Sequence, residues 1–422
     1  MRLFINASLP TSSSACKKVN VLFEETIVRI SQDEIRSEDI AETIDLQGRI
    51  LLPGGVDPHS HVISEADPSK TLERVSKSAI SGGWTTLAEL SYFNPHPLFS
   101  LQDMKSAAKA IDANSHVDMA LWGNVNIDDY PYHAEAALEL WSRGAVGLAL
   151  MTPSPNPAIP ELSFTEIMDL FMDIYESDTA FAFQGFDTES GSQFSFAAQS
   201  AAIKKILRRM QENPIHIPRV ASFPTIEFIN SISKRSDISF SMCLADLMQL
   251  FSKVKTGLQS DLEEYGDLFF ELLRSNKIYM LSNNTLPASV PAGTSEAFAG
   301  ASEKLLPYSY LWALSELWKN RKVPLATVLK MTSENAAKRL GLYPAKGCLE
   351  AGSDADFAIY DPEKTTAFKA PDGSSHELQG AFEAVWLRGK KAWSKGKAAS
   401  AAGAFLPRGA SPKRRHNSLT WL

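Results

Sequence analysis

Two histidines separated by one residue, His59 and His61, are the strongest chemical signal in the sequence. They follow the apolar and glycine-rich segment 52–57, which is typical of a buried strand. Side chains at positions i and i+2 of a strand point to the same face, so both imidazoles can reach one metal ion. The preceding run Pro-Gly-Gly-Val-Asp makes the histidine pair far more specific than it would be alone. The pair therefore predicts one wall of a divalent-metal site.

Short apolar segments that alternate with longer amphipathic stretches fill the chain from 51 to 342. This alternation predicts parallel strands joined by helices, and eight such units fit a (β/α)₈ barrel. The expected strands are 51–57, 84–90, 117–123, 145–150, 180–184, 215–221, 238–243 and 278–282. His59 and His61 follow the first of them, so we expect both at the C-terminal mouth of the barrel, where barrel enzymes hold their active sites.

The two ends of the chain have a different texture from the middle. Residues 1–52 contain short alternating segments separated by polar turns, as small strands require. Residues 343–400 again favour strands and turns, and 357–360 and 384–388 are the clearest strands. Residues 401–422 are small, polar and basic, which predicts an arm or a loose tail.

Three segments together resemble the cyclic amidohydrolase family, which includes dihydroorotases, dihydropyrimidinases (hydantoinases) and allantoinases. They are 52–61 around the histidine pair, TSENAAKRLGL at 332–342 and KGCLEAGSDADFAIYDP at 346–362. The resemblance implies an α/β fold with a TIM-type barrel at 53–342. It also implies a small composite β-sandwich domain built from 1–52 and 343–400, followed by a C-terminal tail at 401–422.

The same resemblance implies a pair of metal ions held by the two histidines, a carboxylated lysine on the fourth strand, histidines on the fifth and sixth, and an aspartate ending the eighth. Only the histidine pair is present. The other positions are occupied by Ala149, Gln184, Arg219 and Asn283. Two imidazoles without carboxylate or thiolate charge hold a divalent ion poorly. We therefore expect no cofactor, and a divalent metal such as zinc at His59 and His61 is the one metal the sequence could offer.

Arg219 has two interpretations, which the sequence leaves open. Its guanidinium could replace the metals by supplying positive charge near Asp57 and Glu89, or it could fill space in a salt bridge. In both cases we expect a cation in the pocket to repel a metal ion. His216 lies three residues before Arg219, so strand alternation is expected to turn its ring to the outer face of the barrel.

Three functional hypotheses follow. The first is a pseudoenzyme with an assembly, regulatory or ligand-binding role, in contact with a protein partner or in a homo-oligomer. The second is an active metal-dependent hydrolase of a cyclic amide with an unusual or mononuclear site, for which Asp187 and Glu65 are weak substitutes as proton carriers. The third is a sensor whose emptied pocket, lined in part by Tyr92 and Asn94, binds a small ureide or anionic ligand.

Charge and composition argue against several classes of protein. The 422 residues carry a net charge of −7, which gives a nucleic-acid partner no electrostatic support. No run of about 18 apolar residues is present, so we expect no membrane span. The three cysteines lie far apart and predict neither a disulfide framework nor a CxxC metal site. Together with the absence of a signal-peptide pattern, this predicts a cytoplasmic protein.

Overall fold

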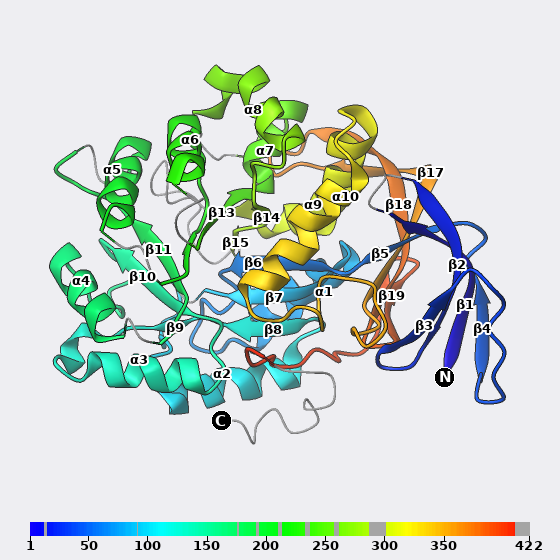
Figure 1. Cartoon of the computed structure of the whole chain (residues 1–422), viewed down its shortest axis with the longest axis horizontal. Coiled ribbons are helices and arrows are strands. Elements are labelled where there is room, and N and C mark those ends of the chain that lie inside the picture. Colours follow the sequence, from blue (N-terminus) through cyan, green and yellow to red (C-terminus); the bar gives the residue numbers. More distant parts are fainter. Residues whose placement is uncertain are drawn as a thin grey trace.

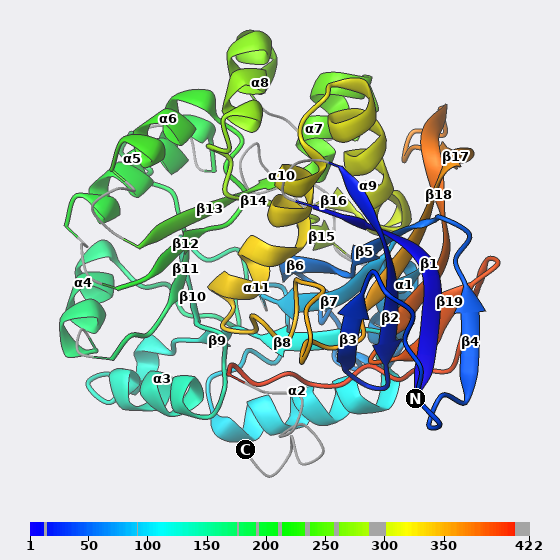
Figure 2. The same cartoon turned by 45° about the vertical axis from the view of Figure 1, so that its right-hand side comes forward.

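A ring of parallel strands surrounded by helices occupies the middle of the chain in the computed structural model (Figure 2). Its strands are β6 (Gly55–Ser60), β7 (Trp84–Glu89), β8 (Asp118–Leu121), β9 (Gly123–Asn124), β10 (Leu148–Thr152), β11 (Phe181–Gly185), β12 (Ile215–Ile217), β13 (Ile238–Cys243) and β14 (Met280–Ser282). Only one residue separates β8 from β9, so the two form a single barrel position, and β14 packs against β6 to close the ring. The (β/α)₈ barrel is confirmed.

The structure describes residues 1–11, 15–90, 92–174, 177–190, 194–209, 213–232, 237–256, 261–286 and 301–409. Within these ranges, no helix is long and apolar enough to cross a membrane.

Helices follow the strands and cover the outside of the barrel (Figure 1). They are α1 (Ser69–Ser81), α2 (Leu101–Asn114), α3 (His133–Ser142), α4 (Phe164–Asp173), α5 (Phe196–Leu207), α6 (Phe223–Ile232), α7 (Leu244–Ser252), α8 (Gly266–Arg274), α9 (Leu306–Trp312), α10 (Leu325–Leu329) and α11 (Asn335–Arg339). A capping box begins α2 at Ser100 and another begins α4 at Ser163. In each, the serine hydroxyl and the acid three residues later satisfy backbone N–H groups that the first turn leaves free.

Both ends of the chain contribute to one sheet beside the barrel. Its strands are β1 (Arg2–Pro10), β2 (Cys16–Phe23), β3 (Ile27–Ser31), β4 (Glu42–Asp45), β5 (Ile50–Pro53), β17 (Phe357–Lys369), β18 (Ser375–Leu387), β19 (Lys390–Ser394) and β20 (Lys397–Ala398). The two ends meet where β5 pairs antiparallel with β17. Phe4, Phe23, Phe357 and Trp386 pack edge to face or tilted within this domain, so residues far apart in sequence share one apolar core.

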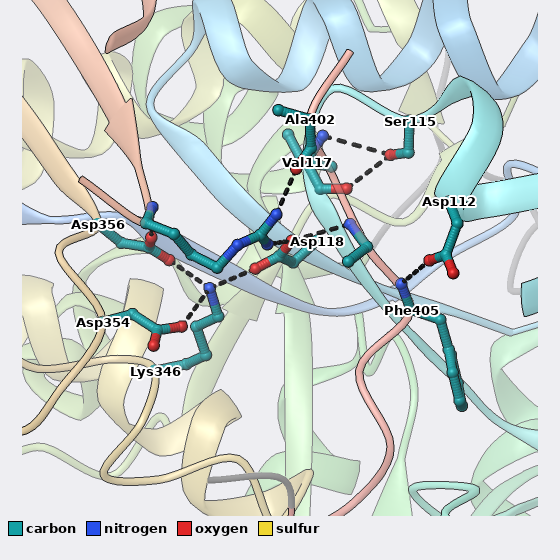
Figure 3. Close-up of polar contacts among 11 residues, drawn as sticks. Asp112, Ser115, Val117, Asp118, Lys346, Asp354, Asp356, Ala402 and Phe405 are labelled. Carbon is teal, nitrogen blue, oxygen red and sulfur yellow. Dashed lines mark hydrogen bonds and ion pairs between the residues drawn. The ribbon is translucent and has the colours of Figure 1, made fainter. Parts of the chain in front are cut away.

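A buried ion cluster joins this domain to the base of the barrel (Figure 3). Lys346 Nζ lies 2.6 Å from Asp118, 2.8 Å from Asp354 and 2.6 Å from Asp356. Arg388 contacts Asp118 as well, and its backbone N–H donates to Asp356 at 2.7 Å. Asp118 begins β8, so the cluster lies at the N-terminal end of that strand, opposite the mouth. Asp354 belongs to the Gly-Ser-Asp turn of 352–354, so this turn helps to join the small domain to the barrel.

Of the two forms expected for 401–422, an arm or a loose tail, residues 401–409 have the first and lie as an arm against the barrel. Phe405 N–H donates to Asp112 at 2.7 Å, and Leu406 N–H donates to the Met119 carbonyl at 2.7 Å. A Cβ added to Gly403 would lie 1.9 Å from the Val117 carbonyl oxygen, so only glycine permits this close approach. Local polarity suggested a tail, but the contacts that hold it come from β8 and α2. Residues 410–422 lie outside the described residues.

Candidate functional site

The histidine pair lies where β6 ends, at the C-terminal mouth of the barrel, with His59 fully buried and His61 4% exposed. The two ring centroids are 6.4 Å apart. Glu89, at the end of neighbouring β7, accepts hydrogen bonds from the backbone N–H groups of Val62 at 2.7 Å and Ile63 at 3.0 Å. This carboxyl group fixes the turn after the pair and so holds both imidazoles at the mouth.

His61 has the orientation that a metal-binding imidazole requires. Its Nδ1 lies 2.7 Å from the Leu90 carbonyl oxygen and donates to it, which leaves Nε2 as the lone-pair atom. That Nε2 lies 3.2 Å from Oδ1 of Asn284. Flipping the Asn284 side-chain amide would place its NH₂ group there, and this group would donate a hydrogen bond to Nε2. The ring stacks on Tyr92 with centroids 5.6 Å apart and meets Phe93 edge on at 5.2 Å. Aromatic packing therefore holds the ring in place.

His59 is held less firmly. Its Nδ1 lies 3.4 Å from Ser241 Oγ, and its Nε2 has no hydrogen-bond partner in the part of the chain that the structure describes. Burial, with the neighbouring His61, lowers the pKa of His59 to about 3. Burial also lowers the pKa of His61 to about 4. Both rings are therefore neutral at pH 7, the form that binds metal.

His216 lies inside the barrel, and the expectation that it faces outward is wrong. It is fully buried, its ring centroid is 6.1 Å from that of His59, and it stacks on Trp122 at 6.4 Å. Strand β12 ends at Ile217, and Arg219 has a φ of +36°, so Arg219 is not part of the strand. The alternation of side chains along a strand therefore cannot be counted back from Arg219 to His216. The register that pairs His216 with Ala182 and Ser239 turns the ring inward.

Two of the replaced ligand positions lie on the barrel strands. Ala149 on β10 is 4% exposed, and Gln184 on β11 is 6% exposed. Gln184 is paired with Met151 of β10. Met151 lies two residues after Ala149, so the two side chains point to the same face of the strand. Neither side chain carries a charge, so neither can offset the charge of a metal ion.

Asn283, the third replaced position, is bonded to groups other than the histidines. Its Oδ1 accepts a hydrogen bond from Ser309 Oγ at 2.6 Å, and its backbone N–H donates to Asp57 at 3.0 Å. The side chain at this strand end that reaches His61 is Asn284, which sequence reasoning missed. Its φ of +46° turns the chain at that point, and a polar residue directly after the strand was the only signal in the sequence.

Arg219, the fourth replaced position, forms a buried ion pair with Asp246 in the first turn of α7. Its Nε lies 3.1 Å from Oδ2 and its Nη2 lies 2.9 Å from Oδ1, and the two side chains are 1% and 0% exposed. Asp57 is instead bonded to Ser60 and Asn283, and Glu89 to backbone N–H groups. Arg219 thus forms the salt bridge that one of the two interpretations predicted. Its charge also helps to lower the pKa of His59, so its field reaches the histidine pair.

Tyr92 and Asn94, expected to line one pocket, face different surroundings. Tyr92 packs on His61 and its hydroxyl donates to the Leu150 carbonyl at 3.3 Å. Burial raises the pKa of Tyr92 well above its usual value, so the phenol stays protonated. Asn94 accepts a hydrogen bond from the His96 N–H at 2.9 Å and lines a separate cavity of about 380 Å³, which also contacts Glu65.

The donors at the barrel mouth do not fit a pair of divalent metal ions. His61 Nε2 and His59 Nε2 are suitable imidazole donors, but no carboxylate or thiolate joins them among the described residues. Within those residues, the one group of three acidic or imidazole side chains close enough to share an ion is Asp118, Asp354 and Asp356. Lys346 and Arg388 already pair with that group, at the opposite end of the barrel.

Comparison with known proteins gives the same fold and related sequences. The model of the amidohydrolase family matches residues 302–391. An allantoinase of Streptomyces avermitilis is 23% identical, with 86% of this chain and 89% of that protein covered. An L-hydantoinase of Paenarthrobacter aurescens is 22% identical, with 90% and 89% covered. The solved L-hydantoinase (dihydropyrimidinase) of Arthrobacter aurescens has a TM-score of 0.76 and 21% identity, over 96% of this chain and 99% of that one.

Proposed function

The chain is a member of the cyclic amidohydrolase family, and from this premise we propose that it is a noncatalytic homologue. In this proposal the barrel is retained for assembly, regulation or ligand binding rather than for hydrolysis. A protein partner or a homo-oligomer and a cytoplasmic location are parts of the same proposal. The relatives named as allantoinase, hydantoinase and dihydroorotase hydrolyse cyclic amides, so loss of hydrolysis would be a departure from that activity.

The state of the replaced ligand positions carries the proposal. Metal-assisted hydrolysis needs a bound water made acidic by the metal, and negatively charged ligands that hold the metal in place. Ala149 and Gln184 supply no charge, and Asn283 bonds to Ser309 instead of facing the histidines. Arg219 pairs with Asp246, and its positive charge near the histidines opposes a bound cation.

A proton carrier is also missing from the position where the family is expected to have its aspartate. Asn283 cannot exchange a proton at neutral pH. The buried carboxyl groups nearby are Asp57 and Glu89, and both are committed to holding the backbone. Burial raises the pKa of Asp57 to about 7 and that of Glu89 to about 8, which keeps much of each group protonated at pH 7.

One observation favours the alternative, a hydrolase with a single metal ion. His59 and His61 are both neutral, and His61 presents Nε2 in the tautomer that suits a metal. Asp57, with a pKa of about 7, lies two residues from His59 and has the acidity of a general base. This alternative predicts that substitution of either histidine abolishes both metal binding and turnover.

Metal analysis combined with activity assays tests the proposal. Purified wild-type chain and a His59→Ala/His61→Ala variant are analysed for bound metals and assayed with dihydroorotate, dihydrouracil, hydantoin and allantoin. We expect no stoichiometric metal and no turnover in either protein. About one ion per chain with turnover, lost in the variant, would establish the mononuclear hydrolase. Two ions with turnover would refute the noncatalytic proposal outright.

A further inference from the structure

A groove of about 940 Å³ lies on the outer surface of the barrel, along α3 and the 3₁₀ turn before it (Ile127–Asp129), where α3 lies beside α2 (Figure 1). It is separate from the histidine pair, which lies inside the ring of strands. Its charged and aromatic lining consists of four carboxylates, one guanidinium and two tyrosines, so negative charge is in excess: Asp128, Asp129, Glu135, Glu139, Arg143, Tyr130 and Tyr132.

The groove combines negative charge with exposed aromatic rings. All four carboxylates are exposed, and within the described residues none of them forms an ion pair. Tyr130 is 62% exposed and Tyr132 is 67% exposed, which is unusual for large aromatic side chains. Carboxylates and aromatic faces are the groups that bind guanidinium and ammonium ions, by charge-assisted hydrogen bonds and by cation–π contact. The groove therefore has the chemistry of a site for a lysine- and arginine-rich segment.

His133 provides an independent sign that the groove is incomplete by itself. Its side chain is 2% exposed, and neither ring nitrogen has a hydrogen-bond partner among the described residues. The ring stacks on Tyr130, with centroids 5.3 Å apart and planes inclined by 29°. A buried imidazole with both nitrogens unbonded is unfavourable. This unbonded imidazole lies directly against Tyr130, one of the rings that line the groove.

The described chain ends beside the same helix. Arg408 N–H donates to the Gly144 carbonyl at 2.8 Å, and its guanidinium lies 3.5 Å from the Trp141 ring centroid. Both contacts are at the last turn of α3 (His133–Ser142) and the residues after it. The one basic run of the sequence, Lys-Arg-Arg at 413–415, begins four residues after Gly409.

Counted from Gly409, the basic run is far enough along the chain to reach the groove. An extended chain covers about 3.3–3.6 Å per residue, so five residues reach roughly 17 Å. A helix rises 1.5 Å per residue, so the ten residues of α3 are about 15 Å long. Every carboxylate on α3 is therefore within reach of 413–415.

We propose that the basic segment Lys413–Arg415 binds the acidic, tyrosine-lined groove of α3. The segment offers three cations to four carboxylates that have no other ion pair within the described chain. The tyrosine rings add contact area for its aliphatic stems and its guanidinium groups. This binding needs no activity at the barrel mouth, so it stands or falls independently of the noncatalytic proposal.

Limited proteolysis of the full chain with trypsin tests the proposal, because trypsin cleaves after lysine and arginine and a bound segment is cleaved slowly. The rate of cleavage at 413–415 is followed by mass spectrometry at 50 mM and 500 mM NaCl. We expect cleavage at low salt to be about tenfold faster in a variant that neutralises the groove. We also expect high salt to speed cleavage of the wild-type chain and to leave that variant unchanged, because salt screens exposed charges. The variant carries D128N, D129N, E135Q and E139Q.

A matched variant removes the same number of exposed negative charges from the 3₁₀ turn Leu262–Tyr265 and from α8. It carries E263Q, E264Q, D267N and E271Q, and its tail should be cleaved at the wild-type rate. A synthetic peptide with the sequence of residues 410–422, made with D-lysine and D-arginine at 413–415 so that trypsin does not cleave it there, should speed cleavage of the wild-type tail by competing for the groove. Equal rates in all three proteins, with no effect of salt or peptide, would overturn the proposal. Should the groove variant unfold, the salt and peptide measurements on the wild-type chain decide alone.

Discussion

Breaking the Arg219–Asp246 ion pair should destabilise the protein strongly, because both groups are buried and each is the other's charge partner. Asp246→Asn leaves a guanidinium at 1% exposure without its counter-charge, and Arg219→Met does the same to the carboxylate. Loss of one member of a buried pair typically costs about 3–5 kcal/mol. Replacing both by apolar side chains of similar volume removes the uncompensated charge and is often close to neutral.

The geometry of the pair supports a loss in the middle of this range. Two hydrogen bonds, at 3.1 and 2.9 Å, join the pair in the fork arrangement that arginine and carboxylate favour. We therefore expect each single variant to lose about 4 kcal/mol and Arg219→Met/Asp246→Leu to lose about 1 kcal/mol or less. The exposed pair of Arg274 with Glu271 is the control, and its loss should cost about 0.5 kcal/mol or less.

Urea unfolding, followed by circular dichroism and tryptophan fluorescence, measures these changes. Coincident transitions and a constant slope against urea show that the free energies of unfolding of the variants can be compared. The reasoning fails if Asp246→Asn costs less than about 1 kcal/mol, since the buried guanidinium would then have another way to be compensated. It also fails if the free energy of unfolding of the double variant falls by as much as those of the two single variants added together, because the two groups would then be energetically independent.

Three further predictions concern buried charges and metal. Burial raises the pKa of Glu89 from its usual 4.5 to about 8, so the folded chain holds a proton that the unfolded chain releases. The free energy of unfolding should therefore fall as pH rises from about 4.5 to 8, by at most about 1.4 kcal/mol per pH unit, and urea titrations of Glu89→Gln should show a shallower fall. Lys346→Met removes one of the two cations, Lys346 and Arg388, that pair with the buried carboxylates at the base of the barrel, and should cost about 3–5 kcal/mol in urea unfolding. Adding Asp356→Asn should recover part of the loss, and no recovery would mean that charge is not the cause. Neither EDTA nor zinc should move the thermal midpoint of the wild-type chain, and a zinc-dependent rise that His59→Ala/His61→Ala abolishes would contradict the poor fit to metal.

The sequence by itself determined the fold and the place of the candidate site. Strand and helix periodicity is a local property, so the alternation between 51 and 342 was enough to predict the barrel. The position of His59 and His61 after the first strand was enough to place them at the mouth. The resemblance to the cyclic amidohydrolases implied which ligand positions are occupied here by Ala149, Gln184, Arg219 and Asn283.

Only the tertiary structure decided what the replaced residues do. Arg219 pairs with Asp246, 27 residues further along the chain, and no spacing rule links the two. The inward face of His216 depended on β12 ending at Ile217, and strand ends depend on partners from other strands. Asn284 reaches His61 because β14 packs beside β6 at the closure of the ring. Each of these contacts joins elements distant in sequence, and the geometry that brings them together is set by the packed barrel as a whole.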